Sequence, residues 1–257
     1  MALTPLHFLI VCPLVFAAGF VDSIAGGGGL ISLPAYMISG LPVHASIATN
    51  KLSSSMGTCI ATVRYAKAGY IDYRLSVFCV AAALVGASLG ANIALLIDDS
   101  LFRVLMLVIL PLTALYVMRK KDLFAHDDAQ QLPFAKLVLF AASIAFVIGM
   151  YDGFYGPGTG TFLILLLTRF AHMDLQHANG ITKVINLSSN IASLTVYLLS
   201  GQVLMLLGLC AGAFSILGNV LGSRCFSRQG AAIARPIILF VLVVFFIKTL
   251  LELSGIL

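Results

Sequence analysis

Long apolar runs recur along the whole chain, and polar residues gather in the short stretches between them. Residues 6–25, 73–97, 101–118 and 236–253 are four such runs, each long enough to cross the roughly 30 Å hydrocarbon core of a bilayer as an α-helix. The weak ten-residue alternation of membrane β-strands is absent. The pattern therefore predicts an all-α polytopic membrane protein.

The sequence also contains an internal duplication, because the same landmark residues recur in the same order in both halves. Lys51 matches Lys183, 132 residues later, and the same shift superimposes several other residues. A shift of 130 residues, after a two-residue insertion, superimposes a second set around Asp22 and Asp152. The matched pairs are Tyr65/Tyr197, Gly69/Gly201, Gly86/Gly218, Gly90/Gly222 and Arg103/Arg235, then Gly19/Gly149, Gly26/Gly156 and Gly28/Gly158.

Each predicted half carries five apolar segments. The first half is 1–118, a polar linker occupies 119–133, and the second half is 134–257. The second segment of each half is short, and a helix of that length spans only about half a bilayer. Segments one and two are therefore expected to form a hairpin broken by glycines, with the second segment either re-entrant or spanning. The segments are 6–25, 30–39, 45–66, 73–97 and 101–118, then 134–151, 159–170, 178–200, 203–223 and 234–253.

The charges of the loops predict how the halves insert. Five crossings per half would turn the second half upside down relative to the first, giving inverted repeats. One side of the membrane then receives most of the basic residues and the linker. By the positive-inside rule that side is cytoplasmic, and both termini are periplasmic. If segments one and two made a single crossing, the halves would instead be parallel. The basic side holds Arg64, Lys67, Arg74, Arg119, Lys120, Lys121, Lys136, Arg169, Arg224, Arg228 and Arg235, and the other side holds Arg103 and Lys248.

Composition agrees with a membrane protein: 60% of residues are hydrophobic and only 10% are charged, against about 25% in soluble domains. Residues 1–5 carry no Lys or Arg, so residues 6–25 are expected to be a retained span rather than a signal peptide. The formal charge of +5 lies in short loops, where topology explains it better than nucleic-acid binding. The five cysteines lack metal-ligand spacing, and His172, Asp174 and His177 are interpreted as loop residues, so no metal is expected.

Glycine-rich breaks follow segment one in both halves. Residues 22–29 read DSIAGGGG and residues 152–160 read DGFYGPGTG. Such backbone cannot stay regularly helical and survives at membrane depth only inside protein or beside water. Amides at the start of segment two would face an anion favourably. Close packing of helices through small residues is the alternative. The candidate binding residues here are Gly26, Gly27, Gly28, Gly156 and Gly158.

A polar stripe runs along segment three of each half, beginning at Lys51 and Lys183. Helical spacing places the hydroxyl and amide side chains that follow each lysine on one face. The stripes are expected to line a pathway for an anion, although a lysine near a span can also extend to the interface. The candidate residues are Asn50, Lys51 and Ser54 in the first half and Thr182, Lys183, Asn186 and Asn190 in the second.

Asp22 and Asp152 lie in apolar surroundings, where an ionised carboxylate is costly. Each carboxyl group must therefore be protonated, paired with a cation such as Lys51 or Lys183, or placed at an aqueous mouth. Either aspartate could couple transport to protons, or simply cap the second segment. An intramembrane aspartyl protease is a less favoured alternative. Tyr151-Asp152 matches half of its signature, but residues 19–22 read GFVD and not Gly-x-Gly-Asp.

Residues 19–29 (GFVDSIAGGGG), 48–52 (ATNKL) and 152–157 (DGFYGP), with Thr182-Lys183, closely resemble the TauE/SafE sulfite exporter family, also called the toluene-sulfonate uptake permeases, and in particular its YfcA-like branch. The resemblance covers essentially the whole chain. It implies a transporter in the bacterial inner membrane for small sulfur-containing anions, sulfite or organosulfonates, with export the best-known direction.

These features favour a secondary carrier that alternates access to an anion site at the midplane between the lysines and the glycine breaks. No nucleotide-binding motif is present, so no cofactor is expected. An anion channel with the same lining and a non-transporting membrane sensor are the alternatives. The substrate, the coupling ion and the oligomeric state, a homodimer among the options, are left open by the sequence.

Overall fold

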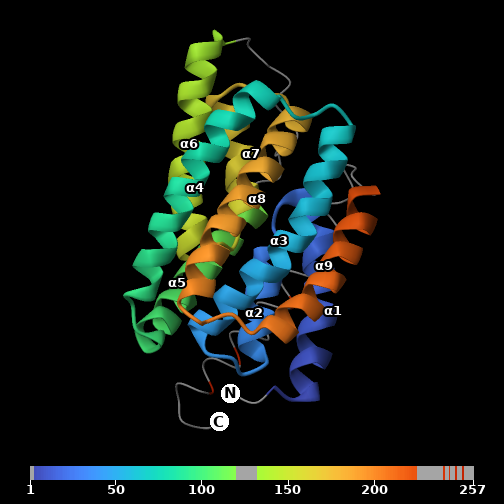
Figure 1. Ribbon diagram of the computed structural model, residues 1–257, viewed down its shortest axis with the longest axis vertical. Helices are drawn as coiled ribbons and strands as arrows, with labels where there is room; N and C mark the ends of the chain where they lie inside the picture. Colours follow the sequence, from blue (N-terminus) through green and yellow to red (C-terminus); the bar gives the residue numbers. More distant parts are fainter. Residues whose placement is uncertain are drawn as a thin grey trace.

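The protein was described from a computed structural model, which covers residues 3–119 and 132–224 together with the single positions 240, 243, 247 and 251. Every regular element in these ranges is a helix, so the predicted all-helical class is confirmed (Figure 1). Most of the fifth segment of the second half and most of the linker lie outside the described residues, as do Lys120, Lys121, Arg228, Arg235 and Lys248. The helices are α1 (Pro5–Ala25), α2 (Gly29–Ile38), α3 (Val43–Lys67), α4 (Tyr73–Leu95), α5 (Asp99–Arg119), α6 (Phe134–Phe154), α7 (Thr159–Phe170), α8 (Leu175–Leu199) and α9 (Met205–Arg224).

Many large apolar side chains are exposed on the outside of the molecule, while many polar side chains are buried beside the apolar core, unlike in a water-soluble protein. Within the described part of the chain, four helices, α1, α4, α6 and α9, are long and apolar enough to cross a membrane. Large apolar side chains stay exposed on α4, α6 and α9, as at Val85, Leu139 and Leu217. The buried polar residues lie mainly on the 25-residue helices α3 and α8, which pack against each other. This distribution suits a surround of lipid with a polar interior.

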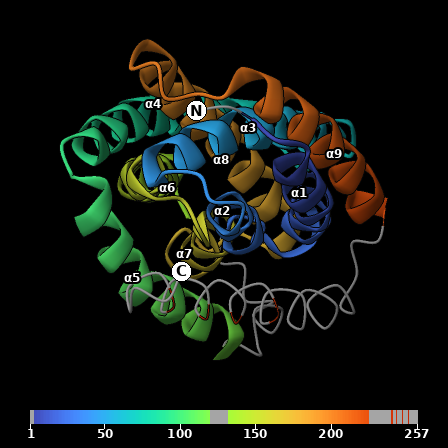
Figure 2. The ribbon, with the colours of Figure 1, turned by 90° about the horizontal axis from the view of Figure 1, so that it is seen from below.

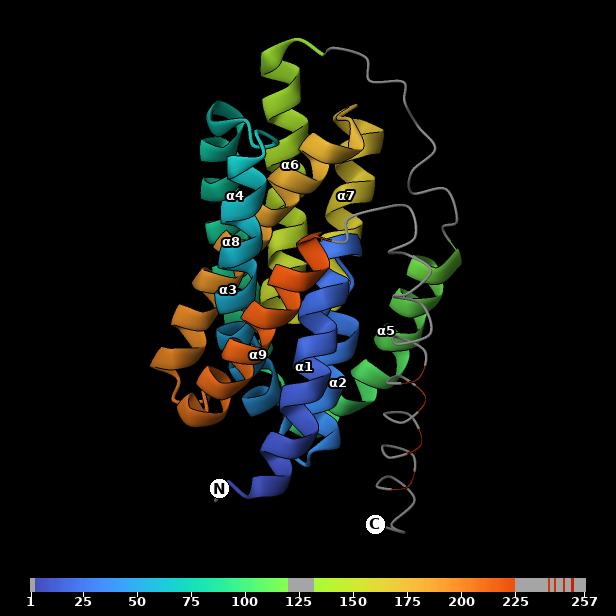
Figure 3. The same ribbon diagram turned by 90° about the vertical axis from the view of Figure 1, so that its right-hand side faces the viewer.

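The two short helices turn back along the helices that precede them. α2 packs on α1 and α7 packs on α6, and Gly26 at the end of α1 adopts a φ of +72° with its N–H bonded to the Asp22 carbonyl. The first helices of the two halves run in opposite directions. α1 rises from the end of the molecule at which N is marked, whereas α6 begins at the opposite end (Figures 1 and 3).

Each half packs mainly against the other through equivalent helix pairs. α1 lies against α9, and α6 lies against α4. A Cβ added at Gly218 would lie 2.1 Å from the Phe16 carbonyl oxygen, and one at Gly86 would lie 2.2 Å from that of Phe146. Glycine therefore lets the backbones touch, as small residues do in membrane helix pairs. Viewed from below, α5 lies at the periphery (Figure 2).

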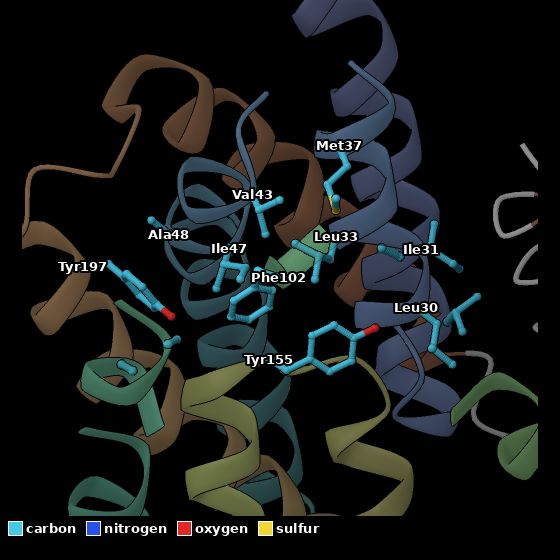
Figure 4. Close-up of a cluster of buried hydrophobic side chains, with 14 residues drawn as sticks. Leu30, Ile31, Leu33, Met37, Val43, Ile47, Ala48, Phe102, Tyr155 and Tyr197 are labelled. Atoms are coloured by element: carbon cyan, nitrogen blue, oxygen red, sulfur yellow. The ribbon is translucent and has the colours of Figure 1, made fainter. Parts of the chain in front are cut away.

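A hydrophobic cluster fixes α2 beneath the glycine breaks. Leu30 and Leu33 of α2 are fully buried beside Ile47 of α3 and Phe102 of α5, and Tyr155 extends toward them from the second glycine break (Figure 4). Because the cluster draws on α2, α3, α5 and the break after α6, it holds the tips of both hairpins in one place.

Candidate functional site

Two buried ion pairs join the halves at the level of the glycine breaks. Lys51 Nζ of α3 lies 2.9 Å from Asp152 Oδ2 of α6, and Lys183 Nζ of α8 lies 3.1 Å from Asp22 Oδ2 of α1. The lysine side chains are 2% and 0% exposed. Each lysine thus meets the aspartate of the opposite half. Sequence reasoning offered a lysine as a partner for each aspartate but could not say which.

The two aspartates are held differently. Asp152 accepts three hydrogen bonds, from the Lys51 ammonium, from the Ser189 hydroxyl at 2.7 Å and from the Thr159 hydroxyl at 2.9 Å. Among the described residues, the Asp22 carboxylate bonds to Lys183, and the same ammonium also donates to the Asp22 backbone carbonyl at 2.6 Å. The Asp22 side chain is 15% exposed, compared with 4% for Asp152.

The tips of the two hairpins touch each other at their glycines. A Cβ on Gly26 would lie 2.6 Å from the carbonyl carbon of Gly160, and one on Gly160 would lie 2.7 Å from Gly26 Cα. Gly156, with a φ of +99°, passes so close to the Lys51–Asp152 ion pair that a Cβ added there would be 3.3 Å from Lys51 Nζ. The breaks are therefore packed against each other and against the charged groups. These contacts agree with both interpretations of the glycine breaks, close packing of helices and the lining of a pathway.

A cavity of about 40 Å³ opens beside these groups, by a measure in which one water needs about 10–15 Å³. It is large enough for a few waters or a small anion. Residues from α1, α2, α3, α6, α7, α8 and α9 surround it. Of the predicted site residues, the lining includes Asp22, Gly26, Gly28, Asn50, Lys51, Ser54, Asp152, Gly156, Asn186 and Asn190.

Four predicted residues do not line the cavity. Lys183 is fully buried behind Asp22. Thr182 is also fully buried, and its hydroxyl has no hydrogen-bond partner in this structure. A Cβ on Gly158 would meet Thr113 of α5 at 2.6 Å, away from the cavity, and Gly27 is absent from the lining. The two lysines are therefore not equivalent, since only Lys51 reaches the open space.

Sequence reasoning missed polar residues that α2 and α9 contribute to the lining, namely Ser32, Ser215 and Asn219. The Asn219 side-chain amide donates to the Ser215 carbonyl at 2.9 Å. Glycines make room for it, because a Cβ at Gly57 would lie 2.5 Å from Asn219 Nδ2. The available signal was the spacing of four between Ser215 and Asn219 inside an apolar run, which places both on one helix face.

The repeat explains why these residues escaped notice. At the shifts that superimpose the halves, Ser215 and Asn219 match Ala83 and Ala87, and Ser32 matches Phe162. Each of these three polar residues thus occurs in one half only, and an apolar side chain takes its equivalent place in the other half. A search restricted to residues shared by both halves could not find them.

Comparison with known proteins decides the family. Residues 11–249 match the family described as "Sulfite exporter TauE/SafE". The chain belongs to this family. The resemblance seen in the sequence is therefore confirmed, and the protein is a multi-pass membrane protein of a transporter family.

Relatives of the family carry consistent descriptions. The chain is 35% identical over 96% of its length to a "Probable membrane transporter protein ORF9" of Sinorhizobium sp, covering 93% of that protein. It is 33% identical to a "Probable membrane transporter protein" of Haemophilus influenzae, over 87% of the chain and 86% of the relative. It is 29% identical to "Probable membrane transporter protein YfcA" of Escherichia coli, over 98% and 93%. No solved structure matches the chain.

Proposed function

We propose that this TauE/SafE family member is a secondary carrier that moves small sulfur-containing anions, sulfite or short organosulfonates, across the bacterial inner membrane by alternating access. One observation carries the proposal. The cavity beside Lys51 lies where the tips of two hairpins, one from each half, touch through Gly26 and Gly160. A site between two such bodies can be exposed to either side when one moves against the other.

The arrangement of the helices supports inverted repeats built from 1–118 and 134–257. α1 and α6 run in opposite directions, and α2 and α7 return along them (Figures 1 and 3). A hairpin that returns leaves the direction of the chain unchanged, so the following helices of the two halves are opposed as well. Carriers with this architecture bind their substrates near the midplane, at broken helices.

The lining suits an oxoanion. Hydroxyl and amide side chains of Ser54, Asn186 and Asn190 can donate to sulfonate or sulfite oxygens, and the Lys51 ammonium can add a charge-assisted bond. Asp22 and Asp152 each pair with a lysine, whereas aspartyl protease chemistry needs two carboxylates that share a proton. The arrangement thus favours binding of an anion over proteolysis.

The distribution of charge supports an orientation. Basic residues occur in the last turns of α3, α7 and α9, at Arg64, Lys67, Arg169 and Arg224. All three helices run toward the end of the molecule where α6 begins (Figure 1). By the positive-inside rule this end and the linker are cytoplasmic, and the end where α1 begins is periplasmic. The family's description as exporters fits an anion that enters the cavity from the cytoplasm.

Uptake of labelled sulfite into proteoliposomes tests the site, with Lys51→Ala and the matched control Lys67→Ala. Both lysines belong to α3, but Lys67 is exposed. Loss of a hydrogen bond to a charged group, about 1.5–3 kcal/mol, predicts flux lowered roughly 10- to 100-fold in Lys51→Ala. The control is expected to keep the unmutated rate. Equal rates in both variants would refute the assignment of Lys51.

Removing one partner of a buried ion pair also destabilises a protein, by about 3–5 kcal/mol. The double variant Lys51→Gln/Asp152→Asn, which removes both charges together, is therefore measured beside the single one. It is expected to elute as folded protein and still to lack saturable sulfite flux. Sulfite flux that stays unsaturable in the unmutated protein would instead favour a channel, and binding without flux would favour a sensor.

A further inference from the structure

We propose that each monovalent anion bound in the cavity is accompanied by one proton, and that Asp22 is the residue that takes it. This inference rests on the proposed function, because it concerns the same cavity. It is carried by the pairing of four charges across the two halves and by the unequal bonding of the two aspartates.

The charges of the site's own side chains sum to zero. Among the described residues, the cavity lining and the groups bonded to it hold two ammonium groups, Lys51 and Lys183, and two carboxylates, Asp22 and Asp152. An anion that enters must share Lys51 with Asp152. The net charge of the site then becomes −1. An unbalanced charge at membrane depth is costly, so binding favours the uptake of a cation. A proton on one of the carboxylates restores neutrality.

The bonding of the aspartates indicates which one is protonated. Protonating Asp152 would disturb a carboxylate that accepts from Lys51, Ser189 and Thr159. Asp22 has one side-chain partner among the described residues and is the more exposed of the two, and like Asp152 it lines the cavity, through which a proton can arrive. Protonating Asp22 therefore disturbs fewer hydrogen bonds than protonating Asp152 does.

The other groups around Asp22 permit this change. Lys183 keeps its 2.6 Å bond to the Asp22 backbone carbonyl when the carboxylate becomes a neutral acid, so its ammonium is not left without an acceptor. α9 and α2 contribute only neutral residues to the cavity. The charged and titratable groups that face Asp22 are Lys183 from α8, Tyr65 from α3 and, across the cavity, Lys51 from α3 and Asp152 from α6.

The loaded site then contains two positive charges, Lys51 and Lys183, and two negative charges, Asp152 and the anion. One proton and one monovalent anion cross together, so the cycle moves no net charge. At equilibrium the anion ratio across the membrane changes about tenfold per unit of pH difference. Net export occurs whenever the ratio of internal to external anion concentration exceeds this equilibrium ratio.

The test counts protons per anion in proteoliposomes holding a pH-sensitive dye, with methanesulfonate as the probe because it stays monovalent near neutral pH. Sulfite is run in parallel, with its own protonation subtracted. The expected result is one proton per methanesulfonate and a rate that does not respond to a potassium diffusion potential. Anion flux without proton movement would overturn the inference but leave the carrier intact. Flux of neither anion would instead refute the proposed function.

Asp22→Asn then tests the residue, with Asp174→Asn, outside the cavity, as the matched control. The Asp22→Asn cycle is expected to move one negative charge and no proton, so that an inside-positive potential accelerates uptake. The control is expected to keep one proton per anion. Proton movement retained in folded Asp22→Asn would overturn the assignment. If that variant does not fold, the proton count of the unmutated protein still decides whether one proton accompanies each anion, because that measurement needs no substitution.

Discussion

Replacing Gly26 by alanine tests whether the two hairpin tips are in contact. The substitution carries two costs. An L-residue at a φ of +72° loses roughly 1–2 kcal/mol in the left-handed region. The new Cβ would also lie 2.6 Å from the Gly160 carbonyl carbon and 2.8 Å from the Thr161 nitrogen, whereas carbon atoms normally stay about 3.5–4.0 Å apart. Overpacking of this kind costs about 1–3 kcal/mol, so a total of roughly 2–5 kcal/mol is expected.

The matched control is Gly201→Ala. Gly201 has nearly the same φ, +70°, but a Cβ there would meet no atom within 4 Å. It should therefore lose only the backbone term of about 1–2 kcal/mol. Thermal unfolding of both variants in the same detergent makes the comparison, with each kcal/mol lowering Tm by about 2–4 °C in a chain of this size class. Equal losses of Tm in the two variants would refute the contact between the hairpin tips.

Two further predictions concern the groups that support the site. Ser189→Ala removes a hydroxyl that donates to Asp152 at 2.7 Å, so thermal unfolding should show a loss of about 2 kcal/mol in stability. The control Ser88→Ala, on the outer helix α4, should change the stability little. Equal losses in the two variants would contradict the role given to Ser189. Asp174 caps α8 through the N–H groups of Gln176 and His177, so Asp174→Ala should cost about 1 kcal/mol at neutral pH. Burial alone would raise the pKa of Asp174, but hydrogen bonds from His177 and Gln176 outweigh it and hold the pKa below its usual 3.8. Because its pKa is lowered in the folded state, the ionised Asp174 carboxylate stabilises the fold above pH 3.8, and this stabilisation is lost as the pH falls and the carboxylate is protonated. The difference in Tm between Asp174→Asn and the unmutated protein should therefore become smaller in acid. A difference in Tm that does not change with pH would contradict this prediction.

The sequence predicted the helices well because lipid and glycine leave strong marks on it. The predicted segment 159–170 coincides with α7, and 30–39 differs from α2 by one residue at each end. Glycines end the preceding helices there, and apolar runs of fixed length have few other readings in a bilayer. The starts of α3 and α8 were placed two to three residues late, because polar first turns resemble loops.

The partners of the charged residues could not be read from the sequence in the same way. Internal repetition identifies Asp22 with Asp152 and Lys51 with Lys183, but it does not say that each lysine bonds across to the other half. That pairing follows from how α3 and α8 cross between the hairpins. Repetition also drew attention to Lys183, which is buried, and away from Asn219, whose counterpart is Ala87 and which lines the cavity.

Counterflow of labelled sulfite tests the account most directly. Proteoliposomes loaded with unlabelled sulfite and diluted into a trace of label should accumulate the label transiently if a carrier with one saturable site exchanges the two. The account predicts this overshoot for the unmutated protein and for Lys67→Ala, and its absence in Lys51→Gln/Asp152→Asn. No overshoot in the unmutated protein, or an undiminished overshoot in the double variant, would contradict a carrier whose site is the cavity beside Lys51.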